Sequence, residues 1–193
     1  MRRLLLTICL TVFSSSPVWA IPRSIEVSGI QLPDRIKVEG RNLVLNGAGL
    51  RSILLTKAYV AALYLPELRH DPHTILDKDI SRSLQLTLLR DISTEQNLDA
   101  LKVGLVANNS QADLNAISRD VDRFLGFIKK LREVTAGTVI RLDYLPGTGT
   151  RVSVNARYVG TIPGKAFNRA VLKIWLGDDP VQTGLKQALL GVD

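Results

Sequence analysis

The sequence predicts an α+β fold in which a large, mainly antiparallel sheet packs against a layer of helices. Residues 24–90 contain short apolar runs that alternate or end at glycine and proline. Residues 93–131 show helical periodicity, and residues 138–162 return to alternating strands before two helical segments. Because strands and helices occur in separate blocks, the order does not favour a doubly wound parallel sheet.

The first residues have the features of a secretory signal peptide. Arg2 and Arg3 precede an apolar stretch that is too short to span a bilayer. Val18-Trp19-Ala20 then offers small residues at the positions that a signal peptidase reads, so cleavage is expected after Ala20. Residues 1–20 are therefore predicted to be a signal peptide, and the protein is predicted to be periplasmic or secreted.

The remaining residues, 21–193, are enough for one domain with its own core. The formal net charge of +7 falls to +5 without the two leader arginines, and the basic residues are scattered among acids. This pattern does not favour a nucleic-acid partner. The only cysteine, Cys9, lies in the leader, so the mature chain is expected to have no disulfide. It is also expected to have no transmembrane segment.

The first strand block begins with the alternating run Ile25–Ile30. Glu39-Gly40 is typical of a hairpin turn, and Leu84–Leu89 is a further strand. Between Arg51 and Pro66 two more strands are expected, after a glycine-rich turn. The segment Glu67–Lys78, which contains a proline and both histidines, is predicted to be a surface loop.

Two helices are expected next. Ser93 and Gln96 have capping-box spacing, which predicts a helix start. Ser110 is expected to cap a second, longer helix that stops near Gly137. Its apolar positions lie on one face: Leu114, Ile117, Val121, Phe124, Leu125, Ile128 and Leu131.

The chain then returns to strands and ends in helices. Strands are predicted at residues 138–144, 151–154 and 158–162, with a tight turn after the first of them. A helix is expected from Lys165 to Leu176, and a last helix from Pro180 to about Leu190.

Several kinds of active chemistry lack support in the sequence. His70 and His73 lie three residues apart in the predicted loop and would need a third ligand from elsewhere to hold a metal. No serine lies in a nucleophile-elbow pattern. Gly47-Ala48-Gly49 lacks the lysine and serine of a phosphate-binding loop. We therefore expect no metal and no cofactor.

The residue that points most clearly to a ligand is Arg51. It follows the glycine-rich segment and lies at the head of two nearly uncharged apolar runs, with the hydroxyl groups of Thr56, Tyr59 and Tyr64 nearby in the sequence. If the chain turns near Thr56, Tyr59 comes to lie beside Arg51 on the neighbouring strand. A guanidinium and a phenol could then hold a carboxylate. The alternative is that Arg51 caps a turn or pairs with a surface acid, and that both tyrosines are core residues.

Two blocks of the sequence resemble the chalcone isomerase-like family, in particular its secreted bacterial branch. The first is the Gly-Ala-Gly-x-Arg segment ending at Arg51 with the strand that follows it. The second is residues 166–177, which are similar to the family's late helix. The resemblance implies an open-faced β-sandwich with a ligand cleft between the sheet and the helices.

The resemblance also implies roles for particular residues. Arg51 falls on the arginine that holds the ligand's anionic group, and Tyr59 falls near the position where the isomerase has a threonine and the fatty-acid binders have a tyrosine. Ile174 and Trp175 replace a hydroxyl residue and a methionine of the isomerase. The isomerase also has a tyrosine and an asparagine after its central strand. This chain has no clear counterpart of that tyrosine, and around residues 91–101 only Gln96 and Asn97 align loosely with the pair.

Three functional hypotheses follow. The first is a non-catalytic binding or carrier protein for a fatty acid or similar apolar carboxylate, with Arg51, Tyr59, Tyr64, Ile174 and Trp175 at the site. The second is an isomerase or lyase that acts on a phenolic or enone substrate. The third is an interaction module whose cleft is filled by its own side chains, above all Trp175. The sequence identifies no partner protein.

Overall fold

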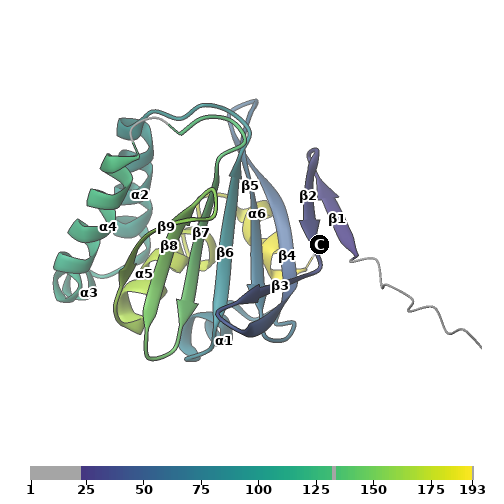
Figure 1. Ribbon diagram of the computed structural model, residues 1–193. Coiled ribbons are helices and arrows are strands. Elements are labelled where there is room, and N and C mark those ends of the chain that lie inside the picture. Colours follow the sequence, from purple (N-terminus) through teal and green to yellow (C-terminus); the bar gives the residue numbers. More distant parts are fainter. Residues whose placement is uncertain (1–22, 132–133, 193) are drawn as a thin grey trace, which may run out of the picture.

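The sheet is a consecutive antiparallel meander of seven strands. The computed structural model describes residues 23–131 and 134–192, so the predicted signal peptide lies outside the described residues. Each strand pairs with the next one along the chain, in the order β3 to β9 (Figure 1). The strands are β3 (Arg35–Val38), β4 (Arg41–Ile53), β5 (Thr56–Leu65), β6 (Arg82–Leu88), β7 (Val139–Leu145), β8 (Gly149–Val154) and β9 (Arg157–Ile162).

Helices cover one face of this sheet and a small hairpin covers part of the other. The helices are α1 (Pro72–Asp77), α2 (Thr94–Asn108), α3 (Gln111–Ala116), α4 (Ser118–Lys130), α5 (Lys165–Leu176) and α6 (Thr183–Leu190). The hairpin consists of β1 (Ser24–Val27) and β2 (Ile30–Pro33). The predicted α+β class, with a large antiparallel sheet against a helical layer, is confirmed.

The sheet separates two apolar clusters. The larger one lies between the sheet and the helices, and Leu63, Phe167 and Trp175 are among its members. The smaller one, which includes Leu32 and Tyr64, lies between the sheet and the β1–β2 hairpin. Because successive strand residues point to opposite faces, neighbouring residues of β5 belong to different clusters.

The capping box that begins α2 is confirmed. The Ser93 hydroxyl accepts a hydrogen bond from the Gln96 backbone N–H, and the Gln96 side chain accepts one from the Ser93 backbone N–H. The helix from Lys165 to Leu176 is also confirmed. The last helix begins at Thr183, three residues after the predicted Pro180.

The second long helix was predicted as one piece and is two. Ser110 caps the short α3 by accepting a hydrogen bond from the Asp113 N–H. At Ile117 the backbone leaves the helical region, with φ −112° and ψ 15°, and α4 begins at the next residue. Ile117 is itself buried in the larger core. The apolar pattern predicts the buried face correctly but does not reveal this break.

Two predictions about the first strand block require correction. The run Ile25–Ile30 is not one strand, because Ser28 and Gly29 both have positive φ and form the turn between β1 and β2. The Gly47-Ala48-Gly49 segment is not a turn, since β4 continues through it. The chain turns instead at residues 54–55, immediately before β5.

The predicted loop at Glu67–Lys78 contains the helix α1. Asp71 caps this helix by accepting hydrogen bonds from the backbone N–H groups of His73 and Thr74, and Pro72 occupies its first position. An Asp-Pro pair is a common helix start, so the sequence did contain the signal that the prediction missed.

Candidate functional site

The β4–β5 hairpin places Arg51 directly opposite Tyr59 in the sheet register. Gly47 and Gly49, which share the parity of Arg51 along β4, face α6 on the helical side of the sheet. The side chains of Arg51 and Tyr59 therefore both lie on the helical face. This is the pairing that the sequence predicted for a turn near Thr56.

Close packing of α6 on β4 brings a second element to Arg51. A Cβ atom at Gly49 would lie 2.7 Å from the Ala188 Cβ, so only glycine permits this approach. The Asn46 side chain donates a hydrogen bond to the Leu189 carbonyl at 2.8 Å and fixes the end of α6 to the strand. As a result, Gln182 at the start of α6 reaches Arg51.

The Arg51 guanidinium is half-buried and bound only to neutral groups. Its Nη1 donates to the Ser52 carbonyl at 2.7 Å and to the Gln182 Oε1 at 3.2 Å. The same Gln182 oxygen accepts from the Ser52 backbone N–H at 3.0 Å. Among residues 23–131 and 134–192, none of the ion pairs involves Arg51. The guanidinium is thus held in place with its charge not neutralised by a described carboxylate.

Tyr59 connects Arg51 to α5. The Trp175 indole Nε1 donates a hydrogen bond to the Tyr59 hydroxyl at 3.0 Å. Burial raises the pKa of Tyr59, while the Trp175 hydrogen bond and the nearby Arg51 charge partly oppose that rise. The phenol therefore stays protonated at neutral pH. Its oxygen accepts from the indole, and its own proton can be donated to a ligand.

An apolar cavity of about 80 Å³ lies beside this pair, between the sheet and helices α2 and α5. Three of its lining residues carry polar groups, namely Tyr59, Asn97 and Trp175. The other lining residues are Leu86, Leu88, Ile92, Ala100, Leu101, Ile140, Ile174 and Val181. Arg51 does not line the cavity itself and is adjacent to it through Tyr59.

Four of the five predicted site residues come together here. Arg51 and Tyr59 are paired across the hairpin, and the adjacent Ile174 and Trp175 project from α5 toward the same cavity. Tyr64 does not join them. It is an odd number of residues from Tyr59 along β5, so it points to the other face of the sheet and is buried in the smaller cluster.

The environment of Tyr64 is unlike that of Tyr59. Its hydroxyl is buried and has no hydrogen-bond partner among the described residues. Burial raises the pKa of Tyr64 to about 12. Tyr64 is therefore a core residue and cannot bind a ligand held at Arg51.

The structure also separates the two loosely aligned candidates at the start of α2. The Gln96 side chain is used in the capping box, whereas Asn97 lines the cavity. The capping-box spacing already indicated that Gln96 would be occupied. Helical geometry then leaves Asn97 as the residue able to face inward.

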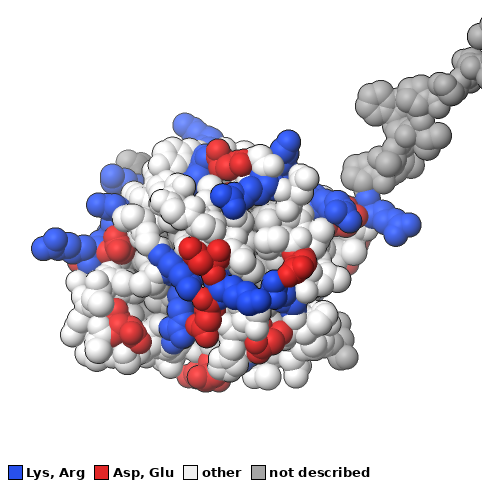
Figure 2. Space-filling view, turned by 90° about the horizontal axis from the view of Figure 1, so that it is seen from below, with Lys and Arg blue, Asp and Glu red and all other residues white. Residues whose placement is uncertain are grey.

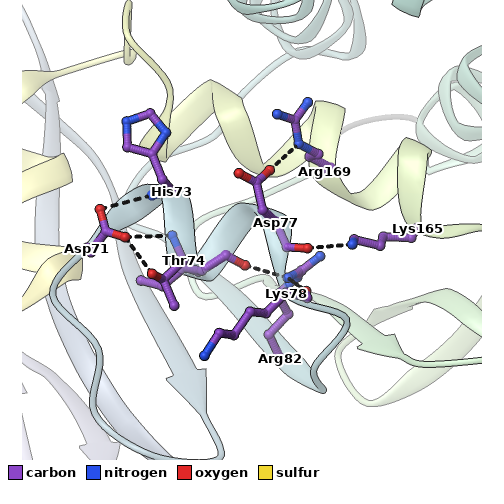
Figure 3. Close-up of polar contacts among 9 residues, drawn as sticks. Asp71, His73, Thr74, Asp77, Lys78, Arg82, Lys165 and Arg169 are labelled. Atoms are coloured by element: carbon purple, nitrogen blue, oxygen red, sulfur yellow. Dashed lines mark hydrogen bonds and ion pairs between the residues drawn. The ribbon is translucent and has the colours of Figure 1, made fainter.

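A second polar cluster surrounds α1, and the sequence analysis missed it (Figure 3). Arg82 is 2% exposed and donates to the Asn168 Oδ1 at 2.6 Å, the Ile75 carbonyl at 2.5 Å and the Lys78 carbonyl at 3.1 Å. Its guanidinium also lies over the Tyr144 ring, 4.7 Å from the ring centre. These contacts tie α1 and α5 to the sheet.

The cluster around Arg82 is structural. Burial lowers the pKa of Arg82 to about 10, although neighbouring negative charges oppose the shift. The adjacent cavity of about 10 Å³ has room for little more than one water molecule. On the surface nearby, Arg169 forms an ion pair with Asp77, and Lys165 donates to the Asp77 carbonyl (Figure 3).

The described residues contain neither a metal-binding cluster nor a helix suited to crossing a membrane. In the part of the chain that the structure describes, no group of three or more His, Cys, Asp and Glu side chains is arranged to hold a metal ion. No helix within residues 23–131 and 134–192 combines the length and apolar character needed to cross a membrane.

The protein is thus an antiparallel meander with helices on one face, and a small cavity lies beside its paired arginine and tyrosine. The chain belongs to the chalcone isomerase-like family, whose model matches residues 24–191. This confirms the family that the two sequence blocks indicated, and its secreted bacterial branch stays a prediction.

One solved structure with the same fold is a fatty-acid binding protein of Arabidopsis thaliana. The two chains are 16% identical, and the match covers 87% of this chain and 96% of the plant chain with a TM-score of 0.70. At this identity the likeness shows the shared fold. No sequence among the curated proteins matches this chain.

Proposed function

We propose that this protein binds a small apolar carboxylate, a fatty acid or a similar molecule, at the cavity between the sheet and helices α2 and α5. The observation that carries the proposal is the half-buried Arg51, which has no described carboxylate partner and lies beside the Tyr59 phenol. The fatty-acid binding function of the Arabidopsis protein with the same fold supports the choice of ligand class.

The chemistry of the pair fits a carboxylate. A guanidinium retains several donors after it binds two neutral acceptors, and hydrogen bonds to charged groups contribute about 1.5–3 kcal/mol each. The protonated Tyr59 can donate one more such bond. Each methylene of the ligand that leaves water adds about 0.8 kcal/mol.

The size of the cavity limits how much of a ligand it can hold. Pockets for drug-sized ligands usually measure about 300–1,000 Å³. The 80 Å³ found here is well below that range. A short acyl chain can enter with small adjustments, whereas a long one requires Trp175 or α2 to move. Trp175 thus lines the cavity.

Equilibrium binding of straight-chain acids from butyrate to palmitate tests the proposal. We expect Arg51→Ala to weaken binding at least about tenfold, since one lost charge-assisted bond exceeds 1.4 kcal/mol. Tyr59→Phe should weaken binding less, and Tyr64→Phe, on the opposite face, is the matched control and should bind as the parent does. Equal affinity of the parent and Arg51→Ala for every acid would refute the proposal.

We also propose that binding takes place in the periplasm or outside the cell. The support is the basic and apolar pattern of the first twenty residues. Fractionation of cells, together with the N-terminal sequence of the purified protein, tests this. An N-terminus at residue 21 is expected, and a cytoplasmic protein that retains residues 1–20 would contradict the proposal.

A second candidate is catalysis of the isomerase or lyase type on an enone. It is favoured by Asn97, which adds a polar side chain to the cavity beside Tyr59 and could stabilise a developing enolate. If the protein is such an enzyme, it turns over an enone substrate, and Asn97→Ala abolishes that turnover. Ligand binding without turnover supports the carrier.

A further inference from the structure

The tip of the β4–β5 hairpin exposes apolar side chains to an unusual degree. Leu54 is 95% exposed and Leu55 is 102% exposed, and the preceding Ile53 is also exposed. Single exposed leucines are common on protein surfaces. Three consecutive apolar residues at one tip form a contiguous patch that needs an explanation.

The local backbone makes this choice of residues more notable. Leu54 has φ 55°, in the left-handed region that glycine, asparagine and aspartate adopt far more readily than leucine. A tight turn would be better served by one of those residues. Leu54 therefore does not help the hairpin to form, and the backbone of the turn does not explain why a leucine occupies this position.

The hairpin that carries the tip has no acidic side chain of its own. Within the described chain, no Asp or Glu occurs between Glu39 and Glu67, a stretch that contains the whole hairpin. Lys57 is exposed and lies opposite Ser52, just behind the apolar tip. An apolar tip with an exposed lysine behind it matches the profile of a membrane interface, where acyl chains lie beneath anionic headgroups.

We propose that the tip formed by Ile53, Leu54 and Leu55 docks this protein on a lipid bilayer that contains anionic headgroups. The two leucines enter the boundary between headgroups and acyl chains, and Lys57 contacts the headgroup phosphates. This contact requires no ligand in the cavity.

The tip lies at the upper end of the sheet in Figure 1. The cavity-lining residues Tyr59 and Leu88 lie near that same end, close to the start of β5 and at the end of β6. Tyr59 follows Leu55 by four residues, a distance of about 13 Å along an extended strand. The opposite end of the molecule carries interleaved acidic and basic residues (Figure 2). Docking by the tip would bring the cavity toward the bilayer. The further step, that the ligand is exchanged with the bilayer, rests on the proposed function.

Vesicle co-sedimentation tests the docking directly. The probe is the protein without residues 1–20, because the apolar leader would bind vesicles itself, and the whole family match and both cores lie beyond that point. Vesicles of phosphatidylethanolamine and phosphatidylglycerol are compared with vesicles of phosphatidylcholine alone, without added fatty acid.

The key variant is Leu54→Asn with Leu55→Ser, in which asparagine tolerates the left-handed turn. Because each leucine transferred from water is worth about tenfold in partitioning, we expect binding to fall about 100-fold. Lys57→Gln should lower binding only to the anionic vesicles, by about fivefold. Leu68→Ser, which removes another exposed leucine beyond the far end of β5, is the matched control and should bind as the parent does.

A labelling experiment gives a second measure that does not depend on affinity. Without residues 1–20 the chain has no cysteine, so an environment-sensitive dye can be attached at Leu55→Cys or Leu68→Cys alone. A blue shift on anionic vesicles is expected at position 55 and not at 68. Equal binding by the parent and the double variant, or no binding by the parent, would overturn the inference. So would a parent dimer that the double variant converts to monomers without lipid, since the tip would then bind a second copy.

Discussion

The close approach of α6 to β4 predicts that Gly47 cannot be replaced even by alanine. An added Cβ would lie 2.7 Å from the Leu189 carbonyl oxygen and 2.9 Å from its carbon, and closer still to the Ala188 oxygen. Non-bonded heavy atoms are comfortable at about 3.5–4.0 Å, so α6 would have to withdraw by about 1 Å. Since the obstacle is backbone, no side-chain rotation can relieve the clash.

The magnitude follows from the cost of overpacking. Inserting a methyl group into a close-packed contact costs about 1–3 kcal/mol, and a backbone obstacle belongs at the upper end. For a chain of this size, about 3 kcal/mol corresponds to a fall in Tm of about 6–12 °C. Withdrawal of α6 would also stretch the Asn46 hydrogen bond to Leu189 and shift Gln182 away from Arg51.

Thermal and denaturant unfolding of Gly47→Ala and of Gly126→Ala measure this effect. Gly126 is the matched control because it lies within α4 and a Cβ there meets nothing within 4 Å. Alanine at that position should stabilise the protein by about 0.5–1 kcal/mol. A Gly47→Ala protein as stable as the parent would show that α6 does not pack against β4 in this way.

Three further predictions concern buried polar groups. Tyr64→Phe should leave the free energy of unfolding unchanged or higher at pH 7, because it removes a buried hydroxyl without a partner. Because the unfolded tyrosine ionises first, the raised pKa of Tyr64 makes the parent lose stability as pH rises from about 10 toward 12. Denaturation at both ends of that pH range should show a smaller loss of stability in Tyr64→Phe. An equal loss in the two proteins would contradict the raised pKa of Tyr64. Arg82→Ala should cost about 3–5 kcal/mol in urea unfolding, because it leaves several buried acceptors unpaired at about 1–3 kcal/mol each, and a loss below about 1 kcal/mol would refute the structural role. Trp175→Phe removes a hydrogen bond that lowers the pKa of Tyr59, so ultraviolet titration should show that pKa rising further; a fall would mean that the indole does not donate to the phenol.

The elements that the sequence predicted well are those with strong local signals. The capping box at Ser93 and the helix Lys165–Leu176 follow from spacing and from flanking glycines. The pairing of Arg51 with Tyr59 also follows from local geometry, once a turn lies between them. Short-range rules therefore predicted the Arg51–Tyr59 pair of the candidate site.

The errors arise where tertiary packing overrides a local preference. Gly47 and Gly49 suggest a turn, but they are glycines because α6 lies against the strand there. Leu54 gives no turn signal although the chain turns at it. Tyr64 was grouped with Tyr59 because the two are close in sequence, and strand alternation places them on opposite faces. Contacts between segments more than a hundred residues apart, such as Tyr59 with Trp175, could come only from the family resemblance.

The central claim is that Arg51 and Tyr59 hold an apolar carboxylate. Native mass spectrometry of the protein purified from its own cells tests this claim most directly. The parent, Arg51→Ala and Tyr64→Phe are compared, and any bound molecule is extracted and identified. We expect a carboxylic acid of matching mass on the parent and on Tyr64→Phe, and none on Arg51→Ala. The same acid retained in full by Arg51→Ala would contradict the account.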